Sequence, residues 1–264
     1  MRVFAISDIH VDYPANMTWL LGLSNYDFRQ DFLLLAGDVS DLPAHLVLAF
    51  DSLQRKFKRV FFLPGNHELW VHRCGSRDSF EKFDLVMQLA RESGLTTEAW
   101  RSETLSIIPL LSWYDFSFGE PDERLSAVWA DFFRCRWRDD CGATKVAGHF
   151  LRQNVNSLWR DGKTVISFSH FLPRIDLMPG AIPLSQRYLY PVLGSQALGA
   201  QINRLNPNIH VYGHSHVNRR VVLDGVRYVN NAFGYPSESN ITAKTLLCIY
   251  DDEASRHAGE LCCG

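Results

Sequence analysis

Short apolar runs alternate with amphipathic stretches along the first part of the chain. We expect helices at residues 14–24 and 43–55, and strands at 2–7, 32–36 and 59–63. Residues 32–36 are consecutively apolar, which is typical of a strand that is covered on both faces. Strands and helices alternating at this spacing predict parallel strands joined by right-handed crossovers.

The rest of the chain continues this alternation with a second set of elements. Helices are expected at 79–92, 146–159 and 195–205, and strands at 105–111, 163–168, 208–212, 219–223, 226–229 and 245–250. The pair Asp224-Gly225 between two strand-like runs predicts a type I′ hairpin. The stretch 177–191 is rich in proline and glycine and is expected to be irregular. No linker or repeat interrupts the pattern, so we expect a single α/β domain over residues 1–264.

Aromatic side chains are concentrated between residues 112 and 137, among acidic residues and glycines. We expect a long loop there, with a short helix from about residue 124. Two interpretations stay open at this point. The aromatic residues fill the core, or the segment at about 112–140 forms a lid or wall over a binding site, as long insertions often do.

Composition and charge exclude several classes of protein. The chain has 264 residues, a net charge of −2 and no basic run, so we do not expect it to bind nucleic acid. No apolar run approaches the roughly 18 residues of a membrane span, and the N-terminus leads directly into a strand without a signal peptide. The six cysteines have neither zinc-site nor disulfide spacing. A reduced, cytoplasmic protein is therefore expected.

Polar residues follow the apolar runs at five points. They are Asp8 and His10, Asp38, Asn66 and His67, His170, and His214 and His216. Ligands bind at the carboxyl ends of strands in open α/β sheets, and imidazole, carboxylate and amide oxygen suit manganese, iron and zinc. Without His67 these are seven candidate ligands, which are too many for one catalytic ion because such an ion keeps an open position. We predict two transition-metal ions that share the Asp38 carboxylate.

The ordered set of these motifs resembles the signature of the calcineurin-like metallophosphoesterases. The matching motifs are Asp8-x-His10, Gly37-Asp38-x-x-Asp41, Gly65-Asn66-His67-Glu68, His170 and Gly213-His214-Ser215-His216. The resemblance implies a two-sheet β-sandwich flanked by α-helices. It also implies that one ion is held by Asp8, His10, Asp38 and His216, and the other by Asp38, Asn66, His170 and His214.

By this resemblance the protein is expected to hydrolyse phosphoesters. The nucleophile would be hydroxide held by both ions, which attacks phosphorus in line, and Asp38 would be essential as the shared ligand. His67 is expected beside the phosphate, either as the proton donor to the leaving group or as a structural partner of a neighbouring acid. Asn66 and Arg174 are further candidates for binding the phosphate.

The substrate is less well defined by the sequence. Trp113 and Tyr114 follow a strand end, where they either stack on an organic group or belong to the core. Asp41 and Glu68 are candidates for orienting ligand imidazoles or for capping a turn. Protein Ser/Thr phosphatases of this superfamily carry Asp-Arg-Gly after the Gly-Asp motif, whereas a Leu-Pro pair follows Asp41 here. We therefore expect a small phosphomonoester or phosphodiester as substrate. A protein phosphatase and a non-catalytic scaffold are the alternatives.

Overall fold

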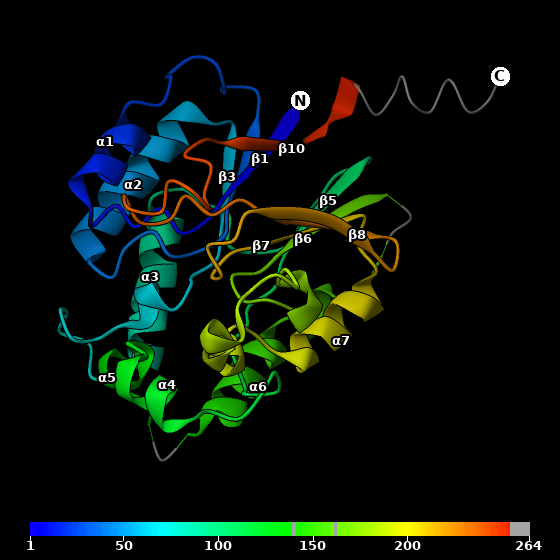
Figure 1. Ribbon diagram of the computed structural model, residues 1–264. Coiled ribbons are helices and arrows are strands. Elements are labelled where there is room, and N and C mark those ends of the chain that lie inside the picture. The colour runs from blue at the N-terminus through cyan, green and yellow to red at the C-terminus, as the bar shows by residue number, and fades with distance from the viewer. Residues whose placement is uncertain (139–140, 161–162, 254–264) are drawn as a thin grey trace.

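The computed structural model describes residues 1–138, 141–160 and 163–253, which form two β-sheets with helices outside them (Figure 1). The smaller sheet has the order β10-β1-β2-β3, with bounds Arg2–Ile6 for β1, Phe32–Leu35 for β2, Arg59–Phe62 for β3 and Leu247–Asp251 for β10. Strands β1, β2 and β3 are parallel, and β10 is antiparallel to β1. The parallel strands predicted for the start of the chain are thus confirmed.

The larger sheet has the order β4-β5-β6-β7-β9-β8. Its strands are β4 (Trp100–Arg101), β5 (Leu105–Pro109), β6 (Thr164–Phe168), β7 (Ile209–Tyr212), β8 (Arg219–Leu223) and β9 (Val226–Asn230). The four middle strands are parallel, while β4 and β8 pair antiparallel at the two edges. The predicted hairpin is present, and its two turn residues Asp224 and Gly225 have φ of 51° and 80°, as a type I′ turn requires.

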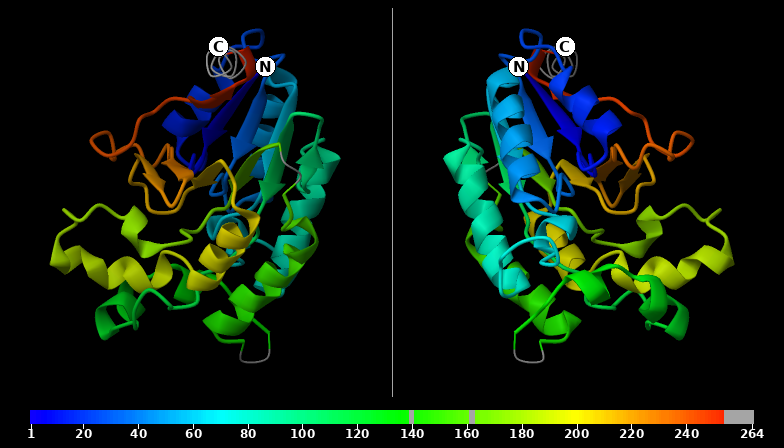
Figure 2. Two further views of the ribbon diagram at one scale, coloured as in Figure 1. Left: turned by 90° about the vertical axis from the view of Figure 1, so that its right-hand side faces the viewer. Right: turned by 90° about the vertical axis from the view of Figure 1, so that its left-hand side faces the viewer.

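Helices cover the outer faces of both sheets (Figures 1 and 2). α1 (Pro14–Leu21) and α2 (Pro43–Lys56) lie on the smaller sheet, and α6 (Ala143–Gln153) and α7 (Gln196–Leu205) lie on the larger one. α3 (Ser79–Glu92) serves both layers, because Val86 packs with the core of the smaller sheet and Phe83 with that of the larger sheet.

The alternation of side chains along the strands builds the layers between these elements. On β1, Val3 and Ala5 point to the space between the two sheets, whereas Phe4 and Ile6 point to the helices. The inner layer is completed by apolar side chains of both sheets, such as Leu34, Phe61, Ile107, Ile166 and Val211. This arrangement confirms the expected α/β fold of two sheets flanked by helices.

The aromatic segment contains two short helices, α4 (Glu123–Val128) and α5 (Asp131–Arg134). The helix predicted near residue 124 is therefore confirmed. Trp113 and Tyr114 are buried in the core of the larger sheet, while Trp129 and Trp137 are partly buried against it and Phe133 is exposed. Residues 139 and 140, the end of the expected lid segment, lie outside the described residues.

Some predicted boundaries differ from the structure. The helix expected at 146–159 ends at Gln153 and is followed by the 3₁₀ turn η2 (Val155–Ser157). Between them, the Asn154 side chain exchanges two hydrogen bonds with the backbone of Leu111, at 2.9 and 2.8 Å. The stretch expected to be irregular contains the end of the 3₁₀ turn η3 (Ile175–Leu177) and most of the 3₁₀ helix η4 (Leu184–Val192).

Candidate metal centre

The loops that follow β1, β2, β3, β6 and β7 meet at one edge of the two sheets. Hydrogen bonds between loop backbones join them. The N–H of Asp8 donates to the carbonyl of Gly37 (2.9 Å), and the N–H of Gly213 donates to the carbonyl of His170 (2.9 Å). Because β1, β2 and β3 run parallel in one sheet and β6 and β7 run parallel in the other, the polar residues after them are brought to this common edge.

Several of these loop residues have left-handed backbone conformations. Eight non-glycine residues of the described ranges have positive φ, and five of them are predicted ligands with φ between 46° and 66°, namely Asp8, His10, Asp38, His214 and His216. This conformation is unfavourable for a residue with a Cβ, by about 1–3 kcal/mol, and such strain clusters at functional sites. The strained backbone turns these side chains toward one another.

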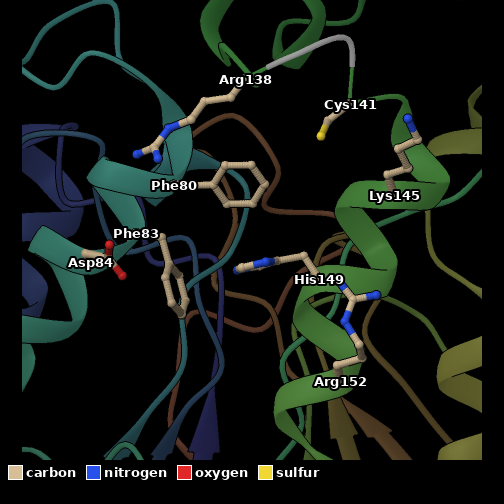
Figure 3. Close-up of a pocket in the computed structure, with 8 residues that line it drawn as sticks. All are labelled: Phe80, Phe83, Asp84, Arg138, Cys141, Lys145, His149 and Arg152. Carbon is tan, nitrogen blue, oxygen red and sulfur yellow. The ribbon is translucent and has the colours of Figure 1, made fainter.

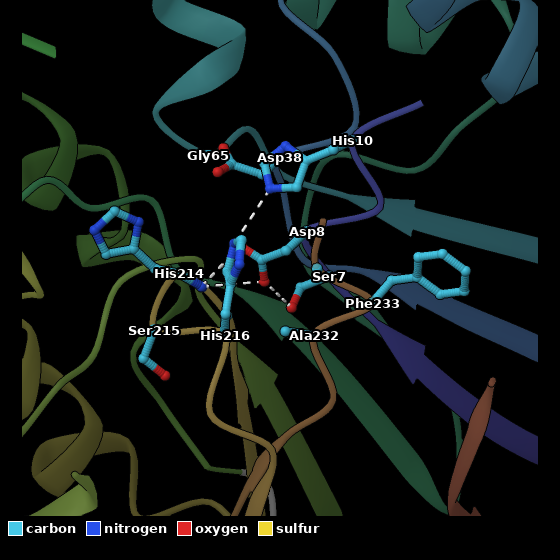
Figure 4. A network of polar contacts seen from close by, with 12 residues as sticks. Ser7, Asp8, His10, Asp38, Gly65, His214, Ser215, His216, Ala232 and Phe233 are labelled. Carbon is cyan, nitrogen blue, oxygen red and sulfur yellow. Dashed lines mark hydrogen bonds and ion pairs between the residues drawn. The ribbon is translucent and has the colours of Figure 1, made fainter. Parts of the chain in front are cut away.

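Asp8, His10 and His216 form what we call the first group (Figure 4). His216 Nε2 lies 3.3 Å from Asp8 Oδ1 and 3.2 Å from His10 Nε2. The Asp8 carboxylate also accepts hydrogen bonds from the Ser7 hydroxyl and from the backbone N–H of His214 (3.1 Å). These contacts fix the carboxylate with an oxygen facing the two imidazoles.

Asp38, Asn66, His170 and His214 form the second group. His170 Nε2 lies 3.1 Å from His214 Nδ1, 3.1 Å from Asn66 Oδ1 and 3.5 Å from Asp38 Oδ1. All four side chains are buried. The ligand atoms of Asp38, His170 and His214 lie within 4.8 Å of one another, which is close enough to hold one metal ion.

Asp38, a member of the second group, also faces the first group. It forms a further cluster with His10 of the first group and with His67, and its Oδ2 is 3.7 Å from His67 Nε2. The His67 ring stacks on Trp70, with 3.6 Å between ring centroids. The structure thus brings all seven predicted ligands and His67 together.

The hydrogen bonds of two imidazoles test whether a cation fits here. His170 Nδ1 faces the carbonyl of Ala36 (2.9 Å), and His214 Nε2 faces the carbonyl of Val192 (3.0 Å). A carbonyl only accepts, so these outer nitrogens carry the hydrogens. The inner nitrogens, 3.1 Å apart, therefore direct lone pairs at each other. A cation between them resolves this repulsion, so the second group fits a transition-metal ion.

Burial and charge perturb the titration of the ligands. Burial, together with the carboxylates of Glu68 and Asp8, raises the pKa of Asp38 well above its ordinary value. Burial acts the same way on Asp8, but His216 outweighs it and lowers the pKa of Asp8. Burial lowers the pKa of His214 to about 3, so this imidazole is neutral at pH 7. Close buried carboxylates beside neutral imidazoles are the environment that a bound cation stabilises.

Glu68, in the 3₁₀ turn η1 (His67–Leu69), holds two ligand loops against each other. Its buried carboxylate accepts four backbone N–H groups at 2.6 to 3.0 Å, from Asp38, Val39, Ser40 and Gly65. Burial raises its pKa to about 7 against the effect of these bonds. Glu68 thus caps the turns, which is the second of its two predicted roles.

Asp41 lies on the same side of the site but turns to other partners. Its carboxylate forms an ion pair with the guanidinium of Arg73 and lies 3.6 Å from His72 Nε2. Arg73 also contacts Asp12 at 3.1 Å. No ligand imidazole is among the described partners of this carboxylate, so its predicted role in orienting one is not seen.

Two side chains that the sequence analysis missed support the first group. Both come from the loop after β9. Glu238 Oε2 accepts a hydrogen bond from His216 Nδ1 (2.6 Å), and the Tyr235 ring stacks on His10 with 4.6 Å between centroids. Neither residue follows an apolar run or belongs to a motif, so no local signal marks them.

The aromatic segment supplies a third residue that was missed. Asp131, at the start of α5, accepts hydrogen bonds from Asn66 Nδ2 (2.9 Å), Trp70 Nε1 (2.7 Å) and Trp129 Nε1 (3.0 Å). The Trp129 ring also contacts the ring of His214, with 5.7 Å between centroids. The segment is thereby tied to the second group.

Three residues considered for substrate binding lie elsewhere. The guanidinium of Arg174 pairs with Asp176 (2.7 Å) and with Asp224 (2.6 Å), which lies in the turn between β8 and β9. Neither partner is a predicted ligand. Trp113 and Tyr114 are only 1% and 3% exposed, so the core interpretation holds for them and they offer no face to a substrate.

A separate cavity of about 550 Å³ lies between α3 and α6 (Figure 3). Its lining consists of Phe80, Phe83, Asp84, Arg138, Cys141, Lys145, His149 and Arg152. None of these side chains belongs to the first or second group, and Arg138 is held by an ion pair with Asp78. The cavity is therefore not part of the metal centre.

A family comparison agrees with this geometry. The model of the calcineurin-like phosphoesterases matches residues 1–218, which include every predicted ligand. The chain therefore belongs to the calcineurin-like phosphoesterase family and is a hydrolase that acts on phosphoric esters. Glu238 and Tyr235 lie beyond the matched residues.

Individual relatives include the [acyl-carrier-protein] phosphodiesterase PptH of Mycobacterium tuberculosis. It is 26% identical, and the alignment covers 89% of this chain and 78% of PptH. The uncharacterized protein L509 of Acanthamoeba polyphaga mimivirus is 22% identical, with 91% and 94% coverage. The crystal structure of the phosphopantetheinyl hydrolase PptH has a TM-score of 0.80 at 24% identity, covering 95% of this chain and 96% of that one, so the two share a fold.

Among the residues that the structure describes, no helix combines the length and the apolar character that a bilayer crossing demands.

Proposed function

We propose that this hydrolase is a binuclear metal-dependent phosphodiesterase. The first and second groups would each hold one ion and share Asp38. The position of the Asp38 carboxylate carries the proposal, because it lies within reach of His10 in the first group and of His170 and His214 in the second. Imidazole, carboxylate and amide oxygen favour manganese, iron or zinc as the native ions.

The side chains around the ions would have distinct tasks. Two ions held by these groups would supply an acidic bound water and neutralise charge on phosphoryl oxygens, which is the chemistry that in-line attack at phosphorus needs. Asp38 would be the ligand that both ions have in common. His67 stacks on Trp70, and its Nε2 lies 3.7 Å from Asp38 Oδ2. Burial lowers its pKa, so as the proposed proton donor to the leaving oxygen it would depend on the negative charge of the bound phosphoester to hold its proton. Asn66, beside His67, would contribute its carbonyl oxygen to the second ion.

We infer that the substrate is a phosphodiester that joins a phosphopantetheine arm to a carrier protein. The support is PptH, which is named an acyl-carrier-protein phosphodiesterase and aligns over most of both chains. Tyr13 and Tyr235 form an aromatic rim next to His10, with 5.5 Å between the tyrosine rings and 4.6 Å from Tyr235 to His10. Such a rim can pack against a long organic arm.

The test is to incubate the purified protein and Mn²⁺ with a phosphopantetheinylated carrier protein and to weigh the carrier by mass spectrometry. We expect the carrier to lose its phosphopantetheine, and a chelator to abolish the loss. An unchanged carrier together with hydrolysis of bis-p-nitrophenyl phosphate would limit the activity to small diesters. Release of phosphate from a phosphopeptide alone would indicate a protein phosphatase, and no hydrolysis at all a scaffold.

A pair of histidine variants controls this experiment. His170→Asn removes a ligand of the second group and should abolish the activity. His149→Asn is the matched control, because His149 lines the separate cavity between α3 and α6. It should retain the wild-type rate. Equal losses in both variants would mean that the activity does not depend on the metal centre.

A further inference from the structure

The buried carboxylate of Asp131, in the aromatic segment, contacts the proposed metal ligand Asn66 and also Trp70, the ring that supports His67. Asp131 is 2% exposed. Its Oδ1 accepts from Asn66 Nδ2 (2.9 Å) and Trp70 Nε1 (2.7 Å), and its Oδ2 accepts from Trp129 Nε1 (3.0 Å). Three N–H donors, two from the loop after β3 and one from the aromatic segment itself, are therefore directed at this one side chain.

The contact with Asn66 decides which way its amide points. The oxygens of Asp131 receive hydrogens here, so they must face the amide nitrogen of Asn66 and not its oxygen. The amide oxygen then points the other way and lies 3.1 Å from His170 Nε2. With the amide reversed, two N–H groups would face the place where a cation binds, and the ligand would be lost.

The contact with Trp70 concerns the proposed proton donor. The His67 ring lies flat on the Trp70 indole, with an interplanar angle of 30° and 3.6 Å between centroids. The same oxygen of Asp131 that orients Asn66 holds the indole N–H. A shift of this carboxylate would therefore displace the ring on which His67 rests.

We propose that Asp131 is a positioning residue, which fixes the Asn66 amide for metal binding and the Trp70 platform for His67. This inference rests on the proposed metal centre but not on the identity of the substrate. The aromatic segment, by this account, completes the site from outside the ligand motifs.

Metal affinity tests the proposal directly. Mn²⁺ is titrated calorimetrically into the wild-type protein and into each variant named below, after circular dichroism has shown that the variant is folded. Asp131→Asn has the same size, but N–H donors face both oxygens of the native carboxylate, so the new amide NH2 must oppose one of them and shift the side chain. The binding of one of the two Mn²⁺ ions should therefore weaken by about 10–100-fold. Asp122→Asn is the matched control, because Asp122 lies in the same segment but is exposed and accepts its hydrogen bond from the backbone N–H of Leu125 at the start of α4. Its affinities should match the wild type.

The third variant separates orientation from packing. Asp131→Glu keeps an acceptor-only carboxylate but adds a methylene, so it should hold Mn²⁺ more tightly than Asp131→Asn. A packing role predicts the reverse order, since the asparagine variant has the native size. If one of these two variants does not fold, the Mn²⁺ affinity of the other still tests the proposal. Wild-type affinity for both ions in Asp131→Asn, or loss of one ion in a folded Asp131→Glu, would overturn the proposal.

A kinetic comparison tests the Trp70 contact. Trp70→Phe keeps a ring under His67 but cannot donate to Asp131, so both Mn²⁺ affinities should stay at the wild-type value. Turnover of a diester with a poor alkoxide leaving group should fall, by up to about 10²-fold, and more than that of bis-p-nitrophenyl phosphate. An equal fall in turnover for the two diesters would overturn the proposed role of Trp70 in supporting His67. A protein that binds two ions but leaves carrier proteins intact would contradict only the proposed substrate.

Discussion

The first and second groups of the metal centre are held in place by different parts of the molecule. In the first group, the outer nitrogen of His216 bonds to the side chain of Glu238, which is 24% exposed. In the second group, the outer nitrogens of His170 and His214 bond to backbone carbonyls. One group therefore depends on a carboxylate near the surface, and the other on the fixed backbone of the fold.

The electrostatics of the two groups differ accordingly. Burial would lower the pKa of His216, but the carboxylates of Asp8 and Glu238 raise it to about 9. In the second group, burial lowers the pKa of His214 to about 3. The first group thus attracts positive charge through its side chains, whereas the second presents neutral imidazoles in a fixed geometry. We expect ion binding in the first group to respond to charge and in the second to packing.

The largest effect is expected from Asp38→Asn, because this residue serves both groups. The amide cannot offer two anionic oxygens, so both ions should bind more weakly and phosphodiesterase activity should fall by more than about 10²-fold. Elemental analysis of the purified protein and a diester assay measure the two effects. The exposed Asp27→Asn is the matched control. Wild-type metal content and activity in Asp38→Asn would remove the basis for a shared ligand.

The next effect isolates the packing of the second group. A Cβ at Gly65 would lie 2.7 Å from His170 Cε1 and 2.8 Å from the Asp38 backbone nitrogen. Gly65→Ala should therefore displace these ligands and lower the free energy of unfolding by about 1–3 kcal/mol. It should also lower the affinity for one of the two ions. Urea unfolding and Mn²⁺ titration measure this. Gly180→Ala, where a Cβ meets nothing within 4 Å, is the control. If both variants behave alike, the close packing is not needed.

A smaller effect is expected from Glu238→Gln, which tests the charge of the first group. The amide keeps a hydrogen-bond acceptor for His216 but loses the negative charge, so one ion should bind about 10-fold more weakly. Binding of the other ion should stay unchanged. Competition with a chromophoric chelator separates the two affinities. The exposed Glu103→Gln controls for the loss of one acid at the surface. Equal weakening of both ions would mean that the two groups are not supported independently.

The meeting of the proposed ligands at one edge of the sheets could be predicted from the sequence, because these residues follow apolar runs. A buried strand is visible as consecutive apolar residues, and parallel strands deliver their end residues to one edge. Asp8 is the second residue after β1 and Asp38 the third after β2, so the position of each along the chain predicts its place in the fold. The layered α/β architecture could be predicted for the same reason.

The supporting residues could not be predicted in this way. Asp131 is 65 residues from Asn66, and Glu238 is 22 residues from His216. Both lie in segments without a hydrophobic period, and their partners are set by how loops pack over the sheet edge. Boundaries such as the end of α6 were missed for a related reason, because a tertiary contact of Asn154 decides it.

The smallest effect is expected from Arg174→Ala, which should alter neither group. The sequence indicated Arg174 as a phosphate-binding residue, but its guanidinium pairs with Asp176 and Asp224 on the surface. Surface ion pairs contribute at most about 1 kcal/mol to stability. We therefore expect KM for the carrier protein and both Mn²⁺ affinities to stay within about twofold of the wild type.

One of the two partners of Arg174, Asp224, provides the control for this prediction. Asp224→Asn removes one ion pair and leaves the guanidinium in place, so it should behave like Arg174→Ala if only the pair matters. A KM that rises about tenfold in Arg174→Ala but not in Asp224→Asn, with unchanged metal content, would show that the guanidinium itself binds substrate. The carrier protein would then extend from the metal centre along the β8–β9 hairpin, since Asp224 lies in its turn. Neither group of ligands would need to move for this contact, so the comparison between them would stand.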